Sequence, residues 1–199
     1  MNKDIKYILA SGSPRRKEIL TRLGIPFTVQ VSEADESHDK EPTEQIVMHL
    51  AQRKAEAVAK QLTVTEESVV IAADTLVSLD GKVLGKPVDR ADAEAMVRSI
   101  SGRTHQVFTG VALIHMPRGE KRVFYERTDV HVKALSEEEI HAWVDSGGGD
   151  DKAGAYAIQG AFGVHISAIE GDYDNVVGFP AARFEKELEE FLEEVHSDE

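Results

Sequence analysis

The chain of 199 residues contains no cysteine. Disulfides, zinc–thiolate sites and catalysis by a thiolate are therefore excluded. It also lacks any run approaching the roughly 18 apolar residues of a membrane-spanning helix, and the apolar run near its N-terminus is too short and too interrupted for a signal peptide. In the absence of both signals, we expect a cytoplasmic protein that does not bind membranes.

Positive charge is scarce. The chain has 23 Lys and Arg against 36 Asp and Glu, a net charge of −13. Nucleic acids and anionic membranes bind basic surfaces, so this balance argues against both as partners. A small phosphorylated ligand is not excluded, because it responds to local charge. We find no repeat, no low-complexity linker and no domain boundary, and we expect a single domain over residues 1–199.

Strand-like and helix-like segments alternate along the chain. We predict strands at 6–10, 27–31, 69–79, 83–84, 107–115, 123–132 and 164–169. We predict helices at 14–23, 43–62, 89–100 and 136–144, and a last helix that begins at Pro180. Hairpin signals such as Asp80-Gly81 lie among these segments, which favours an α/β fold with a mixed sheet over a purely parallel one.

The first candidate site is the loop that runs from Ser11 to Arg16. Ser13 suits an N-cap and Pro14 the first helical position, so a strand–loop–helix turn is expected here. Helix N-termini bind phosphate readily, and Arg15 and Arg16 oppose the helix dipole in a turn where stability alone favours acids. The alternative is a capped helix with two surface arginines. The loop is not a Walker A motif, because the glycine spacing and the Gly-Lys-Ser/Thr ending are absent.

The second candidate is Asp74, which follows the apolar run 69–73. A carboxylate in such a run is costly unless it is paired, hydrogen-bonded or metal-bound. The alternative is a strand-end aspartate bonded to a neighbouring turn. Lys54 is similarly out of place, since it shares a helix face with Val47, Leu50 and Val58. A cleft beside that face would explain it.

Two further segments are weaker candidates. Lys86 lies between Gly85 and Pro87, where it could reach a phosphate as a point charge, although an exposed turn lysine is the simpler interpretation. The glycine-rich stretch 151–160 permits close approach to a ligand, and the Gln159 amide could read a base edge. The alternative is an ordinary glycine-rich connection.

Together these segments resemble the Maf (septum formation inhibitor) family of nucleotide pyrophosphatases, from about Ile5 to the last helix. The main matching segments are Leu9-Ala10-Ser11-Gly12-Ser13-Pro14-Arg15-Arg16, Ala73-Asp74-Thr75, Leu84-Gly85-Lys86-Pro87, Ser101-Gly102-Arg103-Thr104-His105, Asp151-Lys152-Ala153-Gly154-Ala155-Tyr156 and Ile158-Gln159-Gly160. The resemblance implies a twisted mixed sheet flanked by helices, with two lobes and a deep cleft. It also implies a divalent-metal-dependent hydrolase that converts nucleoside triphosphates to the monophosphate and pyrophosphate.

The pairing of Thr75 with Gln159 looks like the subgroup that acts on dTTP and UTP, and modified pyrimidine nucleotides are further expected substrates. The resemblance marks Arg15, Thr75 and Gln159 as specificity residues. Two alternatives stay open. One is a pyrophosphatase for 7-methyl-GTP or another modified nucleotide, and the other is a nucleotide-binding regulator of cell division without significant turnover.

The implied reaction is attack of water at the α-phosphorus, which depends on positioning and charge neutralisation. We expect Glu33 and Asp74 to hold Mg²⁺ or Mn²⁺, hard cations that prefer oxygen ligands. By resemblance Asp74 is the general base, or it orients a metal-bound water. The expected catalytic residues are Asp74, Glu33, Lys54 and Lys86. The expected substrate-binding residues are Ser11, Arg15, Arg16, Thr75, Lys152 and Gln159. The oligomeric state stays open, although a homodimer is the commonest assembly.

Overall fold

The protein is built around one mixed sheet. The computed structural model describes residues 5–39, 41–63 and 66–197. Its strands are β1 (Lys6–Leu9), β2 (Phe27–Val29), β3 (Ser68–Leu79), β4 (Lys82–Leu84), β5 (Thr104–Met116), β6 (Lys121–Val132) and β7 (Ile166–Glu170). The strand order is β2-β1-β3-β5-β6-β7, and β4 pairs with β3. β1 runs parallel to β2 and β3, and the other pairs are antiparallel. The predicted α/β fold with a mixed sheet is confirmed.

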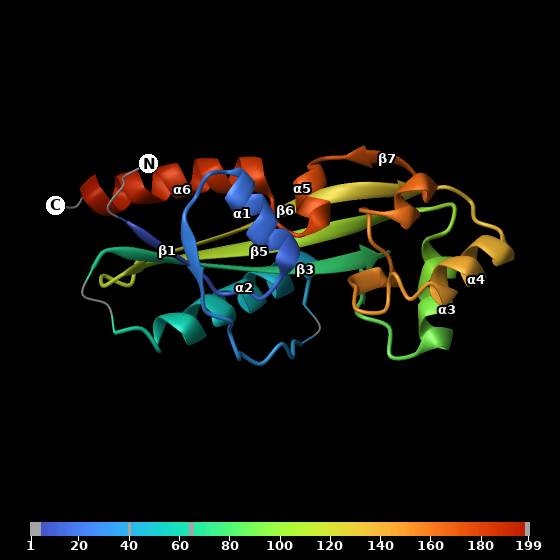
Figure 1. Cartoon of the computed structure of the whole chain (residues 1–199), viewed down its shortest axis with the longest axis horizontal. Helices are drawn as coiled ribbons and strands as arrows, with labels where there is room; N and C mark the ends of the chain where they lie inside the picture. Colours follow the sequence, from blue (N-terminus) through green and yellow to red (C-terminus); the bar gives the residue numbers. More distant parts are fainter. Residues whose placement is uncertain (1–4, 40, 64–65, 198–199) are drawn as a thin grey trace.

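The helices gather at two ends of the long strands (Figure 1). They are α1 (Pro14–Arg22), α2 (Thr43–Ala59), α3 (Arg90–Ile100), α4 (Glu137–Asp145), α5 (Tyr173–Val177) and α6 (Ala181–Ser197), with the short 3₁₀ helices η1 (Ala153–Ala155) and η2 (Ala161–His165). α1, α2 and α6 surround the end where both termini lie, while α3 and α4 cover the other end. β3, β5 and β6 connect the two groups.

Local sequence signals set the helix ends. Ser13 caps α1 by accepting a hydrogen bond from the Arg16 amide, and Pro14 is the first helical residue. Ser136 and Glu139 form a capping box at the start of α4. α2 ends at Ala59, three residues earlier than predicted, because the following turn closes with tighter three-residue hydrogen bonds.

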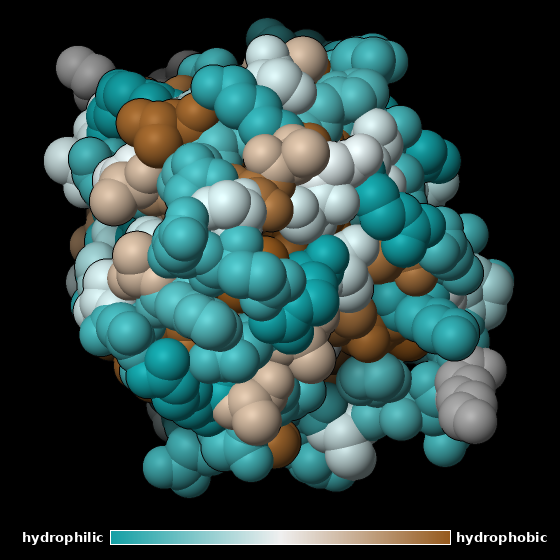
Figure 2. Space-filling model, turned by 90° about the vertical axis from the view of Figure 1, so that its right-hand side faces the viewer, coloured by the Kyte–Doolittle hydropathy of each residue, from teal (hydrophilic) through white to brown (hydrophobic). Residues whose placement is uncertain are grey.

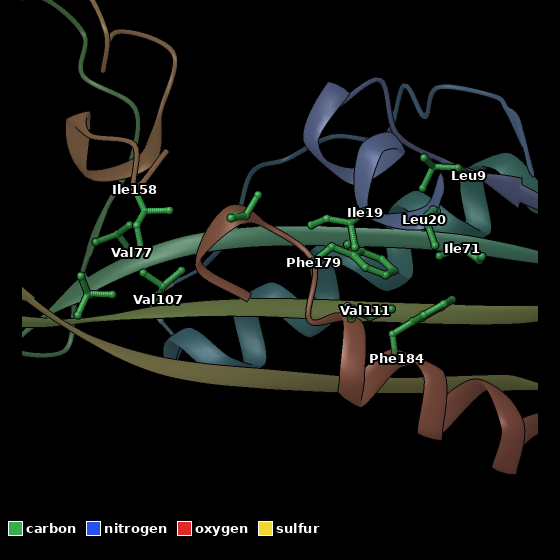
Figure 3. Close-up of a cluster of buried hydrophobic side chains, with 14 of the residues drawn as sticks. Leu9, Ile19, Leu20, Ile71, Val77, Val107, Val111, Ile158, Phe179 and Phe184 are labelled. Atoms are coloured by element: carbon green, nitrogen blue, oxygen red, sulfur yellow. The ribbon is translucent and has the colours of Figure 1, made fainter. Parts of the chain in front are cut away.

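Hydrophobic side chains cover both faces of the sheet. On one face, small residues of α2 pack against β3 and β5, which lets the helix lie close to the strands; this cluster comprises Ala10, Ala51, Ala55, Val58, Val70, Ala72, Ala112 and Ile114. On the other face, α1 and the C-terminal segment contribute larger side chains. Ile19, Phe179 and Phe184 meet Ile71 and Val111 of the sheet there (Figure 3).

We expect Gly110→Ala to lower the free energy of unfolding by about 3 kcal/mol, because it overpacks the contact between β5 and α2. A Cβ at Gly110 would lie 2.3 Å from the Val47 carbonyl oxygen, which belongs to the helix backbone. Urea unfolding measures the change. Gly85→Ala is the matched control, since a Cβ there meets nothing within 4 Å. Equal losses in both variants would contradict this account of the packing.

The surface at the α3–α4 end is mostly hydrophilic, with hydrophobic residues scattered over it (Figure 2). Among the described helices, none is long and apolar enough to cross a membrane.

Candidate active site

One edge of β3 lacks a partner strand over its middle. β1 pairs with this strand only as far as Ile71, and β4 begins to pair at Val77. Within the described residues, no strand pairs with the edge between these two positions. Successive side chains of a strand point to opposite faces of the sheet, so Asp74 and Thr75 lie on different faces. A gap at the edge of the sheet is open to both faces, and both residues line the cavity there.

A cavity of about 510 Å³ lies at the gap. Its lining comes from α1, α2, β3, the loop after β4, and the segment around η1. The lining includes five cationic side chains and three carboxylates, in a protein whose net charge is −13; they are Arg15, Arg16, Lys54, Lys86, Lys152, Glu36, Asp74 and Asp151. The cavity therefore concentrates positive charge in an acidic protein, as a site for an anion requires.

Lys54 joins two carboxylates on the α2 side of the cavity. Its Nζ lies 2.5 Å from Asp74 Oδ1 and 2.7 Å from Glu36 Oε1. Asp74 is 8% exposed, and Lys54 supplies this buried side chain with a hydrogen-bonding partner. The hydrogen bond from Lys54 holds the pKa of Glu36 below its ordinary value, against the opposing effect of burial. The cation in the apolar face of α2 is thus explained by its position beside the cavity.

Arg16 occupies the other side of the gap. Its guanidinium donates to the Gly178 carbonyl at 3.0 Å, to Thr75 Oγ1 at 3.1 Å and to Ser11 Oγ at 3.3 Å. These three acceptors are neutral. Burial lowers the pKa of the Arg16 side chain, an effect that the nearby Asp74 opposes. A cation held in the cavity wall by neutral groups keeps its charge available for an anionic ligand.

The η1 segment and the loop after β4 form adjoining parts of the cavity wall and are joined by a hydrogen bond. The Gly154 amide donates to the Gly85 carbonyl at 3.0 Å, which ties the η1 segment to the loop that carries Lys86. Lys152 pairs with Asp151, and this hydrogen bond lowers the pKa of Asp151; Arg15, on the opposite wall, has a smaller effect in the same direction. Cationic groups from both ends of the sheet therefore face the same space.

Apolar side chains form another part of the lining. Val77 of β3 pairs with Val107 of β5, and Ile158 lies against both (Figure 3). Tyr156 completes this part of the wall, and Gln159 lies beside it at the exposed rim. Val77 is three residues beyond Asp74, which corresponds to about 10 Å along a strand. A ligand with an apolar ring and a charged chain matches this arrangement.

The structure brings most of the predicted site residues together. Eight of them line the cavity: Arg15, Arg16, Lys54, Asp74, Thr75, Lys86, Lys152 and Gln159. Ser11 does not line it; its side chain is buried, and its hydroxyl accepts from the Ser13 amide and from Arg16. Glu33 is exposed and also lies outside the lining.

Sequence reasoning did not identify Glu36 or Tyr156. Glu36 belongs to the polar loop between β2 and α2, which contains several acids, and nothing in the loop distinguishes the one that reaches Lys54. Tyr156 belongs to one of the segments that match the family. Its burial in the cavity wall, however, depends on contacts with β5 that are distant in sequence.

The described residues contain no group of three or more His, Cys, Asp or Glu side chains placed to hold a metal ion. Asp74 and Glu36 are nevertheless two oxygen donors at one cavity. Mg²⁺ is commonly bound by one or two carboxylates together with substrate phosphates and water. This donor set fits a cation shared with a phosphorylated substrate, rather than a cage made by protein alone.

Comparison with known proteins gives a consistent result. The model of the family described as Maf-like protein matches residues 6–191. A dTTP/UTP pyrophosphatase of Bacillus cytotoxicus is 48% identical over 188 residues, which cover 94% of this chain and 95% of the relative. A dTTP/UTP pyrophosphatase of Moorella thermoacetica is 49% identical, with 92% and 93% covered. One from Agathobacter rectalis is 43% identical, with 92% and 96% covered.

Proposed function

Because this chain belongs to the Maf-like protein family, we propose that it hydrolyses dTTP and UTP to the monophosphate and pyrophosphate. The observation that carries the proposal is the cavity at the open edge of β3. Cationic side chains and an apolar wall line this cavity, together with the carboxylates of Asp74 and Glu36. The names of the relatives, which align over nearly the whole chain, support the pyrimidine substrates.

Asp74 is the proposed proton acceptor. The oxygen of a water molecule forms a bond to the α-phosphorus, the bond from that phosphorus to the oxygen leading to the β-phosphorus breaks, and the water proton passes to the carboxylate. Lys54 holds Asp74 in place at 2.5 Å. Since one edge of β3 has no partner strand at Asp74, a phosphate in the gap can approach this side chain directly.

The arginines and lysines neutralise the triphosphate. Arg16 has its hydrogen bonds to neutral oxygens, and Arg15 and Lys86 approach from opposite walls. Charge on the departing pyrophosphate grows during the reaction, so fixed cations stabilise the transition state more than the ground state. Lys152 has a carboxylate partner in Asp151 and contributes less.

A divalent cation, Mg²⁺ or Mn²⁺, is part of the proposal. Asp74 and Glu36 would hold it together with phosphate oxygens, and it would supply further charge neutralisation at the phosphates. Glu33 was the ligand expected from the sequence. Glu36 takes that place in the proposal because it lies on the cavity and shares Lys54 with Asp74.

Rapid release of pyrophosphate from dTTP and UTP is expected, with slower release from CTP, ATP, GTP and 7-methyl-GTP. The measurement is a panel of these nucleotides with Mg²⁺ or Mn²⁺, and with a chelator in place of the metal. Preferred turnover of 7-methyl-GTP would replace the pyrimidine assignment. Binding of nucleotides without turnover, detected as a shift in melting temperature, would replace the enzyme by a nucleotide-sensing regulator.

A further inference from the structure

A buried histidine lies beneath the apolar wall of the cavity, outside the lining itself. His105 of β5 is 0% exposed. Its Nε2 is 2.7 Å from the Tyr156 hydroxyl oxygen, and the two rings meet edge to face with centroids 5.0 Å apart. Its other ring nitrogen, Nδ1, is buried without a hydrogen-bond partner within the described part of the chain. The ring therefore makes a single polar contact, and that contact is with a cavity residue.

The unpaired Nδ1 atom of His105 lowers the stability of the folded protein. A buried polar atom without a partner loses its hydration and gains nothing in return. Burial lowers the pKa of His105 to about 4, so the ring is neutral at physiological pH and carries one proton. A leucine or phenylalanine would fill the same space without an unpaired nitrogen. The hydroxyl of Tyr156 is the feature that a histidine satisfies and an apolar residue does not.

Tyr156 belongs to an irregular segment that is largely buried and packs against β3 and α3. Besides the contact with His105, the segment is held by Trp143 Nε1, which donates to the Ala155 carbonyl at 2.8 Å, and by the bond from Gly154 to Gly85. Of these three hydrogen bonds, only the one with His105 comes from a strand of the sheet. Gln159 follows three residues after the tyrosine, at the cavity rim.

Base recognition by a glutamine demands a fixed backbone. Uracil and thymine present an acceptor oxygen where cytosine presents an amino donor. A glutamine side chain offers both a donor and an acceptor, and an amide that is free to turn can match either base. Discrimination therefore depends on neighbouring groups that hold the base and the amide in one relative position, and small displacements remove it.

We propose that His105 is a positioning residue for base recognition, which acts through the Tyr156 hydroxyl to fix the segment that carries Ile158 and Gln159. The inference rests on the proposed pyrimidine nucleotide substrate. It assigns His105 no contact with the substrate and no part in the chemical step. If the role were only structural, loss of the contact would lower stability and leave the choice of base unchanged.

The test compares Tyr156→Phe with Tyr7→Phe. Both remove one buried tyrosine hydroxyl, but the Tyr7 hydroxyl lies on β1 with no hydrogen-bond partner among the described residues. We expect Tyr156→Phe to reduce the ratio of kcat/KM for UTP over CTP by about tenfold, with Tyr7→Phe close to the wild type. The preference in binding is measured separately by the melting-temperature shifts that UTP and CTP produce, which do not require turnover.

His105→Gln and His105→Leu complete the experiment. The glutamine amide can still bond to the tyrosine hydroxyl, so its ratio is expected to lie nearer the wild type than that of the leucine variant. An unchanged ratio in folded Tyr156→Phe would overturn the inference while the dTTP and UTP activity stood. A wild-type protein that neither binds nor hydrolyses pyrimidine nucleotides would overturn the proposed function, and this inference with it.

Discussion

Asp74→Asn is expected to reduce kcat for dTTP and UTP by about 1,000-fold, because asparagine cannot accept the proton of the attacking water. The two side chains have the same shape, so the fold should persist. Lys54 retains Glu36 as a partner 2.7 Å away, which avoids leaving a buried cation alone. The measurements are steady-state pyrophosphate release and the melting temperature.

Asp80→Asn is the matched control for this variant. Asp80 directly follows the same strand, at the hairpin turn, and forms an exposed ion pair with Arg103. Its φ of 51° lies in the left-handed region, which asparagine tolerates. We expect full activity from this variant. Near-normal turnover by Asp74→Asn would remove the carboxylate from the chemical step, whatever the control shows.

The second large effect is a loss of stability in acid that depends on His105. Burial holds the pKa of this histidine at about 4, compared with 6.5 when it is solvated, while Asp129 opposes the shift and His131 adds to it. The unfolded chain takes up a proton as the pH falls through 6.5, but the folded protein does so only near 4. The contribution of the neutral, buried His105 to the free energy of unfolding is therefore intact above pH 6.5 and is lost as the pH falls from 6.5 to about 4. It amounts to about 3 kcal/mol in total.

His105→Gln isolates this contribution, because glutamine does not titrate. Urea unfolding at several pH values between the two limits should give a steeper decline for the wild type than for the variant. His141→Gln is the control, since His141 lies on the surface of α4 with its side chain 50% exposed. The account fails if His105→Gln and the wild type lose stability in parallel as the pH falls.

Features written in short stretches of sequence could be predicted. Ser13-Pro14 starts α1, and the capping box of Ser136 starts α4, because each signal acts within one turn of helix. Asp74 and Lys54 could be chosen as candidates because each is a charge in an apolar pattern. The structure shows why both are tolerated, since Lys54 Nζ lies 2.5 Å from Asp74 Oδ1.

What depended on distant contacts could not be predicted. The loop before α2 offers several acids, and only the folded chain distinguishes Glu36, beside Lys54, from Glu33, which is exposed and lies outside the cavity lining. His105 lies in a segment that matches the family, but the sequence does not indicate its contact with Tyr156, which follows 51 positions later.

The open edge of β3 has a consequence for solubility. An unpaired strand edge in an apolar sheet is a template for strands of other molecules, and natural proteins protect such edges with inward-pointing charges or with covering segments. Here the unpaired stretch lies within the cavity, flanked by Asp74, Lys54 and Arg16. A foreign strand would have to bury these charges in order to pair. The charged groups that we propose to bind the nucleotide therefore also protect this edge against aggregation.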